Sequence, residues 1–282
     1  QIENFLTKVE NYFFDQRVKI ADPYTTSHSD IILLLIDENS LNELSPLLGR
    51  WPWPRFIYYD ILEFLHLSNV KSINIDILFT ESQANNQNQI EDDHLLSQAT
   101  HQFQPVNHAM KLSIDKLRKN INNDELPAIP DYFQKKISLP SDLPLSLFKK
   151  TSDYFLPFPQ LAQKTNYSGF VDIITDSDGI VRKVDLIRRY KNKLYPSFSL
   201  SQYIQLTQAS RIQAYNDKLM IDQINIPLLS DQTYLIKMKQ DFKTISAASV
   251  IQSIQALKQG RINDMSLSPT EFENKIIFIG TS

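Results

Sequence analysis

The 282-residue chain contains no cysteine and only five glycines. The absence of cysteine excludes disulfides, a catalytic thiol and zinc sites built on thiolates. It leaves the compartment open, because cytosolic and periplasmic proteins can both lack cysteine. The phosphate-binding, dinucleotide-binding, hydrolase and metalloprotease motifs are missing as well. We therefore predict no catalytic residues, no metal site and no cofactor.

Charges of the two signs nearly balance. Lysine and arginine number 29, aspartate and glutamate 32, and the formal net charge is −3 without any block of like charges. A nucleic-acid-binding domain would usually carry a basic face, so we expect no nucleic-acid partner. The longest aliphatic run, at 31–36, has the length of a strand and is too short for a membrane-spanning helix.

Both ends of the chain look cut. It starts at Gln1 and stops at Ser282, directly after the strand-like run IIFIGT. We expect it to be a piece of a longer protein, so its own lack of a membrane-spanning run says nothing about that parent.

Residues 2–20 predict an amphipathic helix. The apolar side chains Ile2, Leu6, Val9 and Phe13 recur on one stripe, and charged residues lie off it. Pairing of two copies through this helix, which would make the protein a homodimer, is our hypothesis.

A strand, a helix and a second strand follow. Residues 31–36 are typical of a buried strand, residues 55–68 carry apolar side chains at helical spacing, and residues 71–79 again favour a strand. This order predicts a parallel pair of strands joined by a right-handed crossover.

The remainder adds helices, strands and one long irregular stretch. Residues 83–89 are rich in Asn and Gln and predict a solvated loop. Residues 113–165 predict a long, partly extended excursion, and two β-branched runs around the Ser-Asp-Gly turn at 177–179 predict a hairpin. We predict one α/β domain over residues 1–282, with a mixed, largely parallel β-sheet flanked by helices.

Acidic residues occur at the end of the first predicted strand and within the second. Asp37 and Glu38 follow the first strand, and ligands of α/β sheets usually bind at the carboxyl ends of strands, so both are candidate ligand-binding residues. Asp76 falls inside the second predicted strand. A buried carboxylate there needs a partner, and Arg55 on the crossover helix is the nearest cation by topology. We predict an Arg55–Asp76 ion pair.

The only two tryptophans, Trp51 and Trp53, are each followed by proline. Proline restricts the residue before it to extended conformations, so the two indoles are held in fixed directions. They are candidate ligand-binding residues. The other interpretation is a structural plug that packs on the sheet, which we favour because large aromatics mostly serve burial.

Three histidines, His94, His101 and His108, are seven residues apart. On a helix this spacing separates neighbours by about 10 Å along the axis, too far to share one metal ion. We interpret them as ordinary surface histidines.

Several stretches resemble the type-two CHASE domain, a sensory extracellular domain associated with cyclases and histidine kinases. They are ILLLIDENSLNEL, RWPWPRFIYYDILEFL and VKSINIDILFTE, followed by SGFVDIITDSDGIVRKVDLI, YPSFSLSQYIQL and FENKIIFIGTS. The resemblance covers most of the chain in order. Residues 107–150 do not take part in it and are expected to be a variable insertion.

The resemblance implies a sensor that lies outside the cytoplasmic membrane. Residues 1–20 would be the entry helix from the membrane, and the parent an inner-membrane protein with a cytoplasmic cyclase, kinase or cyclic-di-GMP enzyme. It also implies that the Trp-Pro turn serves the fold and is not a ligand-specific contact. The resemblance implies no catalytic residues. The ligand, extracellular or periplasmic, is unknown.

From these observations we expect a signal-input domain in which a ligand or partner shifts the population of two arrangements. Two alternatives stay open. One is an interaction module without a small-molecule pocket, with residues 113–165 as its contact. The other is a metal-dependent enzyme using Asp37, Glu38 and Asp76.

Overall fold

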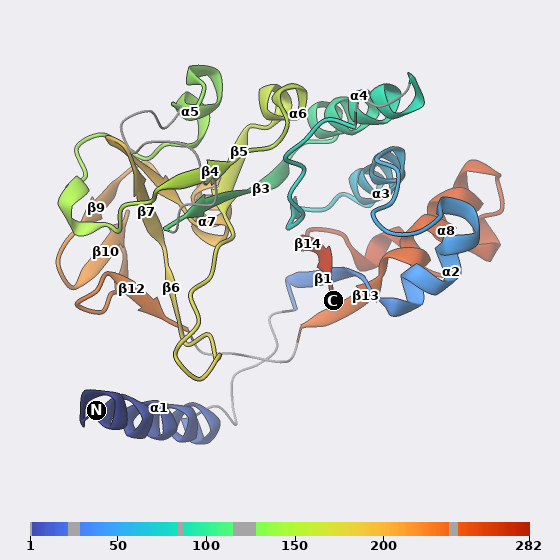
Figure 1. Ribbon diagram of the computed structural model, residues 1–282. Coiled ribbons are helices and arrows are strands. Elements are labelled where there is room, and N and C mark those ends of the chain that lie inside the picture. The colour runs from blue at the N-terminus through green and yellow to red at the C-terminus, as the bar shows by residue number, and fades with distance from the viewer. Residues whose placement is uncertain (1, 22–28, 84–86, 115–127, 237–241) are drawn as a thin grey trace.

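The computed structural model describes residues 2–21, 29–83, 87–114, 128–236 and 242–282. At its centre is a seven-stranded sheet of order β13-β1-β14-β2-β3-β4, in which β5 also pairs with β3 (Figure 1). Only the β3–β4 pair is antiparallel among the pairs of this sheet. Its strands are β1 (Ile31–Ile36), β2 (Ser72–Ile75), β3 (Val106–Ser113), β4 (Asp153–Phe155), β5 (Tyr167–Phe170), β13 (Lys243–Ser246) and β14 (Ile276–Thr281). The predicted mixed, largely parallel sheet is confirmed.

Helices cover both faces of this sheet. Ile32, Leu34 and Ile36 alternate along β1 and pack into one core with α2, α3, α4, α6 and α8. On the opposite face, Phe198 of α7 meets Phe278 of β14 edge to face, with ring centroids 6.3 Å apart. The helices are α1 (Ile2–Ala21), α2 (Glu38–Leu48), α3 (Phe56–Leu67), α4 (Gln87–Gln102), α5 (Asp131–Ile137), α6 (Pro159–Lys164), α7 (Phe198–Thr207) and α8 (Ala247–Lys258).

Buried amides fix α7 on the sheet. Asn107 of β3 lies within hydrogen-bonding distance of Asn74 on β2, at 2.8 Å, and of Gln202 on α7, at 2.6 Å. Gln202 also donates to the hydroxyl of Ser72 over 2.9 Å. A buried polar network of this kind holds its members in one arrangement, so the N-terminus of α7 has a set position over β5.

Smaller sheets lie beyond β5, on the side of the main sheet away from β13 (Figure 1). They belong to two further cores of buried apolar residues. Their strands are β6 (Lys183–Asp185) with β12 (Thr233–Leu235), β7 (Ile187–Tyr190) with β8 (Lys193–Pro196), and β9 (Ile212–Ala214), β10 (Lys218–Ile221) and β11 (Ile224–Pro227).

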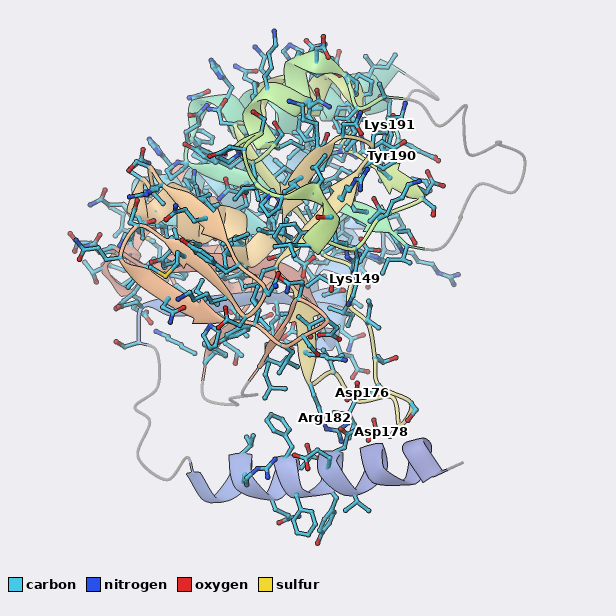
Figure 2. All side chains as sticks on the ribbon, turned by 90° about the vertical axis from the view of Figure 1, so that its left-hand side faces the viewer. Lys149, Asp176, Asp178, Arg182, Tyr190 and Lys191 are labelled. Atoms are coloured by element: carbon cyan, nitrogen blue, oxygen red, sulfur yellow. The ribbon has the colours of Figure 1, made fainter. Side chains whose placement is uncertain are left out.

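The predicted N-terminal helix is confirmed as α1, which lies apart from the sheet, beside the loop between β5 and β6 (Figures 1 and 2). Tyr12 is 61% exposed and Phe13 53% exposed. The side chains of Ile2 and Leu6 lie outside the described residues. Within the described ranges, no helix is both long and apolar enough to cross a bilayer.

Three predictions about segments need correction. The Asn/Gln-rich stretch at 83–89 enters α4 at Gln87, and its residues 84–86 lie outside the described ranges. The predicted hairpin has its turn, but β5 pairs with β3 and β6 with β12. The excursion at 113–165, of which 115–127 are not described, contains α5, β4 and α6.

The predicted variable insertion at 107–150 also begins too early, because residues 107–113 belong to β3 in the main sheet. Farther along, Ile129 and Phe133 are buried in a core that includes Met110 of β3. The second half of this stretch is therefore part of the fold.

Candidate functional site: a pocket linked to the N-terminal helix

A pocket of about 230 Å³ opens at the carboxyl end of β2, between β5, β6, β14 and the start of α7. We call it the Asp76 pocket. It is lined by Asp76, Phe170, Val171, Asp172, Ile173, Val184, Asp185, Ser197, Phe198, Ser199 and Phe278. In α/β sheets the carboxyl edge of the parallel strands is where ligands usually bind.

Gly169 sets the close approach of β5 and α7 that forms one wall. A Cβ atom at this position would lie 2.5 Å from the backbone oxygen of Ser197 and 2.6 Å from Phe198. Only glycine fits, because both neighbours are backbone atoms. As a result Ser197, Phe198 and Ser199 stand directly beside the end of β5.

Two of the three carboxylates in the pocket are compensated by cations. Asp185 accepts from Arg188 Nε over 2.8 Å and from Lys149 Nζ over 2.7 Å. Asp172 accepts from the backbone N–H of Leu112 over 2.7 Å and lies 3.7 Å from Arg188. Arg188, which is 1% exposed, also stacks on Phe170 with its guanidinium 4.6 Å from the ring centroid.

The third carboxylate, Asp76, has no hydrogen bond or ion pair to any of the described residues. β2 ends at Ile75, so Asp76 stands exposed at the edge of the sheet. The surrounding side chains still withhold part of its solvation, and this burial raises the pKa of Asp76. Asp76 is therefore the carboxylate of the pocket that is not compensated by a described group.

The predicted Arg55–Asp76 ion pair is wrong. Arg55, 7% exposed at the start of α3, pairs with Asp93 of α4 and donates to the backbone oxygen of Glu81. Its guanidinium also lies 4.6 Å from the ring centroid of Phe158. The pair ties α3 to α4. The carboxylate of Asp76 is exposed to solvent, so water can hydrate it without a cation from the protein.

Asp37 and Glu38 do not line the Asp76 pocket. Asp37 caps α2, accepting from Ser40 N over 2.8 Å, from Ser40 Oγ over 2.6 Å and from Ser246 Oγ over 2.9 Å. Burial opposes its ionisation, but these hydrogen bonds outweigh burial and lower the pKa of Asp37. Glu38 is exposed in the first turn of α2.

The two tryptophans also lie away from the pocket. Trp53 is 2% exposed within the main core, and Trp51 is 36% exposed with its ring edge-on to Trp53 at 5.5 Å. The indole N–H of Trp53 has no acceptor among the described residues. The burial of Trp53 fits the interpretation as a structural plug, and ligand binding by either tryptophan stays a prediction.

The segment 171–185, which we call the linking segment, connects the pocket to α1. Val171, Asp172 and Ile173 at one end and Val184 and Asp185 at the other line the pocket. Between them the chain turns at Gly179, whose φ of +82° suits glycine. The segment thus leaves the pocket and returns to it.

The turn of the linking segment holds α1 through one arginine. Arg182 donates to Asp15 of α1 over 2.9 and 2.8 Å, to Asp176 over 3.0 Å, and to Asp178 over 3.0 and 2.8 Å. The hydrogen bond from Arg182, followed by that from the backbone N–H of Ile180, lowers the pKa of Asp178. Figure 2 shows Asp176, Asp178 and Arg182 directly above α1. The pocket wall and α1 are therefore joined by a short stretch of chain and the ion pair between Arg182 and Asp15.

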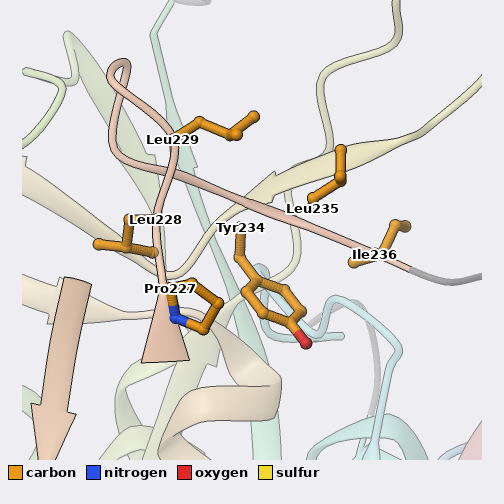
Figure 3. Close-up of a pocket in the computed structure, with 6 residues that line it drawn as sticks. All are labelled: Pro227, Leu228, Leu229, Tyr234, Leu235 and Ile236. Atoms are coloured by element: carbon orange, nitrogen blue, oxygen red, sulfur yellow. The ribbon is translucent and has the colours of Figure 1, made fainter. Parts of the chain in front are cut away.

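A second hollow, of about 570 Å³, lies between β11 and β12. Its described lining comes from two neighbouring stretches of chain (Figure 3), Pro227, Leu228 and Leu229 on one and Tyr234, Leu235 and Ile236 on the other. None of these side chains is charged. Ligand sites need a few placed polar groups to fix orientation, and the Asp76 pocket meets that requirement better.

The Asp37, Glu38 and Asp76 carboxylates do not form a metal site. Across the described ranges, no group of three or more His, Asp or Glu residues is placed to hold a metal ion. Asp37 is engaged at the start of α2, and Asp76 lies in its own pocket. The structure therefore does not bring these three acids together in one group.

Comparison with known protein families matches the whole chain, residues 1–282, to the CHASE2 domain. Comparisons with curated proteins and with solved structures find no match.

Proposed function

The chain belongs to the CHASE2 family of sensory extracellular domains, and from this membership we propose that it is the signal-input domain of a bacterial transmembrane receptor. In this proposal a small molecule binds in the Asp76 pocket, at the periplasmic side of the inner membrane. The parent protein carries a cytoplasmic cyclase, kinase or cyclic-di-GMP enzyme as its output.

The observation that carries the proposal is the linking segment. Both of its ends line the Asp76 pocket, and its turn holds α1 through the Arg182–Asp15 ion pair. A ligand that favours one position of the pocket wall would favour one position of α1, which is a population shift between two arrangements. If α1 leads from the membrane, that shift is the signal.

Pairing of two α1 helices is part of the proposal. Phe13 and Asp15 are two residues apart and so project about 200° apart around a helix. Asp15 holds Arg182, and Phe13 is exposed on the other side. This arrangement supports a second copy as the partner of the Phe13 face.

The alternative of an interaction module without a pocket has less support. It relied on a removable contact segment at 113–165. Phe133 of that stretch is 0% exposed and belongs to the same core as Met110 and Phe170. Deletion of the segment would expose this core, so it does not behave as an appendage.

We expect the domain to be accessible from outside the cytoplasmic membrane. The chain lacks cysteine, so Asn192→Cys, at an exposed position between β7 and β8, gives it a single thiol, and the same parent protein without this substitution is the control for labelling elsewhere. In cells that make the chain within its parent protein, a membrane-impermeant maleimide should label this thiol once the outer membrane is permeabilised. Labelling that requires rupture of the inner membrane would refute the location.

Arg182→Gln is expected to release α1 from the linking segment. Gln lacks the charge and the five donors with which Arg182 holds Asp15, Asp176 and Asp178. Spin labels attached at Arg17→Cys and Asn192→Cys should give a narrow distribution of label-to-label distances in the chain that keeps Arg182. In Arg182→Gln the distribution should be broad.

The matched control is Lys183→Gln. Lys183 is the next residue, and its described ion pair is with Asp231 at 2.8 Å. It should keep the narrow distribution. Equal distance distributions in Arg182→Gln and in the chain that keeps Arg182 would contradict the coupling of α1 to the linking segment.

A further inference from the structure

The charge balance of the Asp76 pocket points to the ligand it accepts. Asp185 and Asp172 are already compensated by Arg188, Lys149 and a backbone N–H. Asp76 has no described partner and faces the same hollow. A ligand that enters therefore meets one uncompensated negative charge.

The rest of the wall is aromatic and hydroxylic. Phe198 and Phe278 meet edge to face at 6.3 Å, and both line the pocket beside Asp76. Phenyl faces attract cations, most strongly when the cation is partly desolvated. The hydroxyls of Ser197 and Ser199, 3.2 Å from each other, add hydrogen-bond acceptors at the same wall.

These groups select against other ligand classes. An anion would face Asp76 without a free cation in the pocket lining, since the lysines and the arginine nearby are engaged with Asp172 and Asp185. A hard metal ion needs six or more oxygen ligands, several of them charged, and the uncompensated charge here is one carboxylate. An uncharged apolar molecule would leave Asp76 without a partner.

The size of the pocket sets an upper limit on the ligand. Its volume of about 230 Å³ is below the roughly 300–1,000 Å³ of sites for drug-sized molecules. The part of the ligand that enters is therefore compact, with few non-hydrogen atoms.

We infer that the Asp76 pocket binds a small organic cation, with an ammonium group against the Asp76 carboxylate and its carbon substituents against Phe198 and Phe278. The inference rests on the proposed sensory function in one respect, since it assigns the chemical class of the signal that this function requires.

The test is titration calorimetry of the whole chain with probes that differ in charge at similar size. n-Propylammonium and tetramethylammonium are the cations, n-propanol is the neutral probe and propionate is the anion. Saturable binding is expected for at least one cation, at least tenfold tighter than for n-propanol or propionate. Failure of both cations to saturate, or equal affinity for n-propanol, would overturn the inference.

Two variants locate the site. Asp76→Asn should weaken binding of the cation at least tenfold and leave the unfolding midpoint unchanged, because Asp76 has no described partner to lose. Glu38→Gln removes an exposed carboxylate from α2, outside the pocket, and should bind like the parent chain. Unchanged affinity in Asp76→Asn, or a loss shared by Glu38→Gln, would place binding elsewhere.

The outcomes separate this inference from the proposed function. If the chain binds ammonium ions at Asp76 but is labelled only from the cytoplasm, the ligand site is supported and the receptor function is refuted. If the chain is labelled from outside and its α1 is coupled through Arg182, but it binds neither cation, the receptor function is supported and the ligand class is refuted.

Discussion

Replacement of Arg55 by alanine is expected to lower the free energy of unfolding by about 3–5 kcal/mol, the usual cost of removing one partner of a buried ion pair. Arg55 and Asp93 have side chains that are only 8% and 5% exposed. Without the guanidinium, Asp93 keeps its charge in the core, and Phe79 and Phe158 lose the cation that lies between them. Urea denaturation of the purified chain measures the change, and a fall of roughly 10 °C in the melting temperature should accompany it.

Three further variants make this prediction specific to the observed partner. Asp93→Asn should destabilise strongly as well, because it leaves Arg55 buried without its counter-charge. Asp76→Asn should leave the stability nearly unchanged. Lys243→Ala, which breaks an exposed pair with Glu271, should cost no more than about 1 kcal/mol. The Arg55–Asp93 pairing would be contradicted if Asp76→Asn were strongly destabilised and Asp93→Asn had the stability of the unsubstituted chain.

The composition of the stretch around Asp93 is the reason why Asp93 was not predicted as the partner of Arg55. The stretch before Asp93 is rich in Asn and Gln, which favours a loop, and the start of α4 within it has no clear apolar pattern. One signal was nevertheless present: Asp93, Leu96, Thr100 and Phe103 share a stripe at helical spacing, and all four are buried. A carboxylate on an apolar stripe requires a cation, and Arg55 supplies it.

The order of the strands could not be predicted from local patterns. The two strands joined by the crossover, β1 and β2, are indeed parallel to a common neighbour, but that neighbour is β14 from the end of the chain. Periodicity identifies a strand and its faces, whereas pairing depends on contacts across some 200 residues. The Asp76 pocket was missed for the same reason, because β5, β6, α7 and β14 meet Asp76 only through this topology.

The regular spacing of the three histidines led to the wrong prediction that His108 lies at the surface. The interval of seven from His101 suggested three equivalent surface residues, but His94 and His101 are exposed on α4 while His108 is 0% exposed within β3. Its two neighbours in sequence, Asn107 and Ala109, are also buried. A strand covered on both faces buries every residue, whatever its polarity.

The buried imidazole predicts a loss of stability in mild acid. His108 Nε2 lies 2.8 Å from the hydroxyl of Thr100, its Nδ1 has no partner among the described residues, and burial lowers the pKa of His108 to about 3. The folded chain therefore stays unprotonated here while the unfolded chain takes up a proton below about pH 6.5. Because the unfolded state binds more protons between these values, stability falls as the pH falls, by about 2 kcal/mol between pH 7.5 and pH 5.

Urea denaturation at steps from pH 7.5 to pH 5 measures this slope, and the histidines themselves provide the controls. His108→Gln should be less stable at every pH but should lose most of the slope. His94→Gln and His101→Gln, which replace exposed side chains on α4, are the matched controls and should keep the slope of the unsubstituted chain. The carboxylate of Asp37, whose pKa is lowered in the folded chain, contributes stability that is lost only as the pH falls below about 4, outside this window. A slope that survives in His108→Gln would mean that the imidazole accepts its proton within the folded chain, and hence that water reaches Nδ1 between β3 and α4.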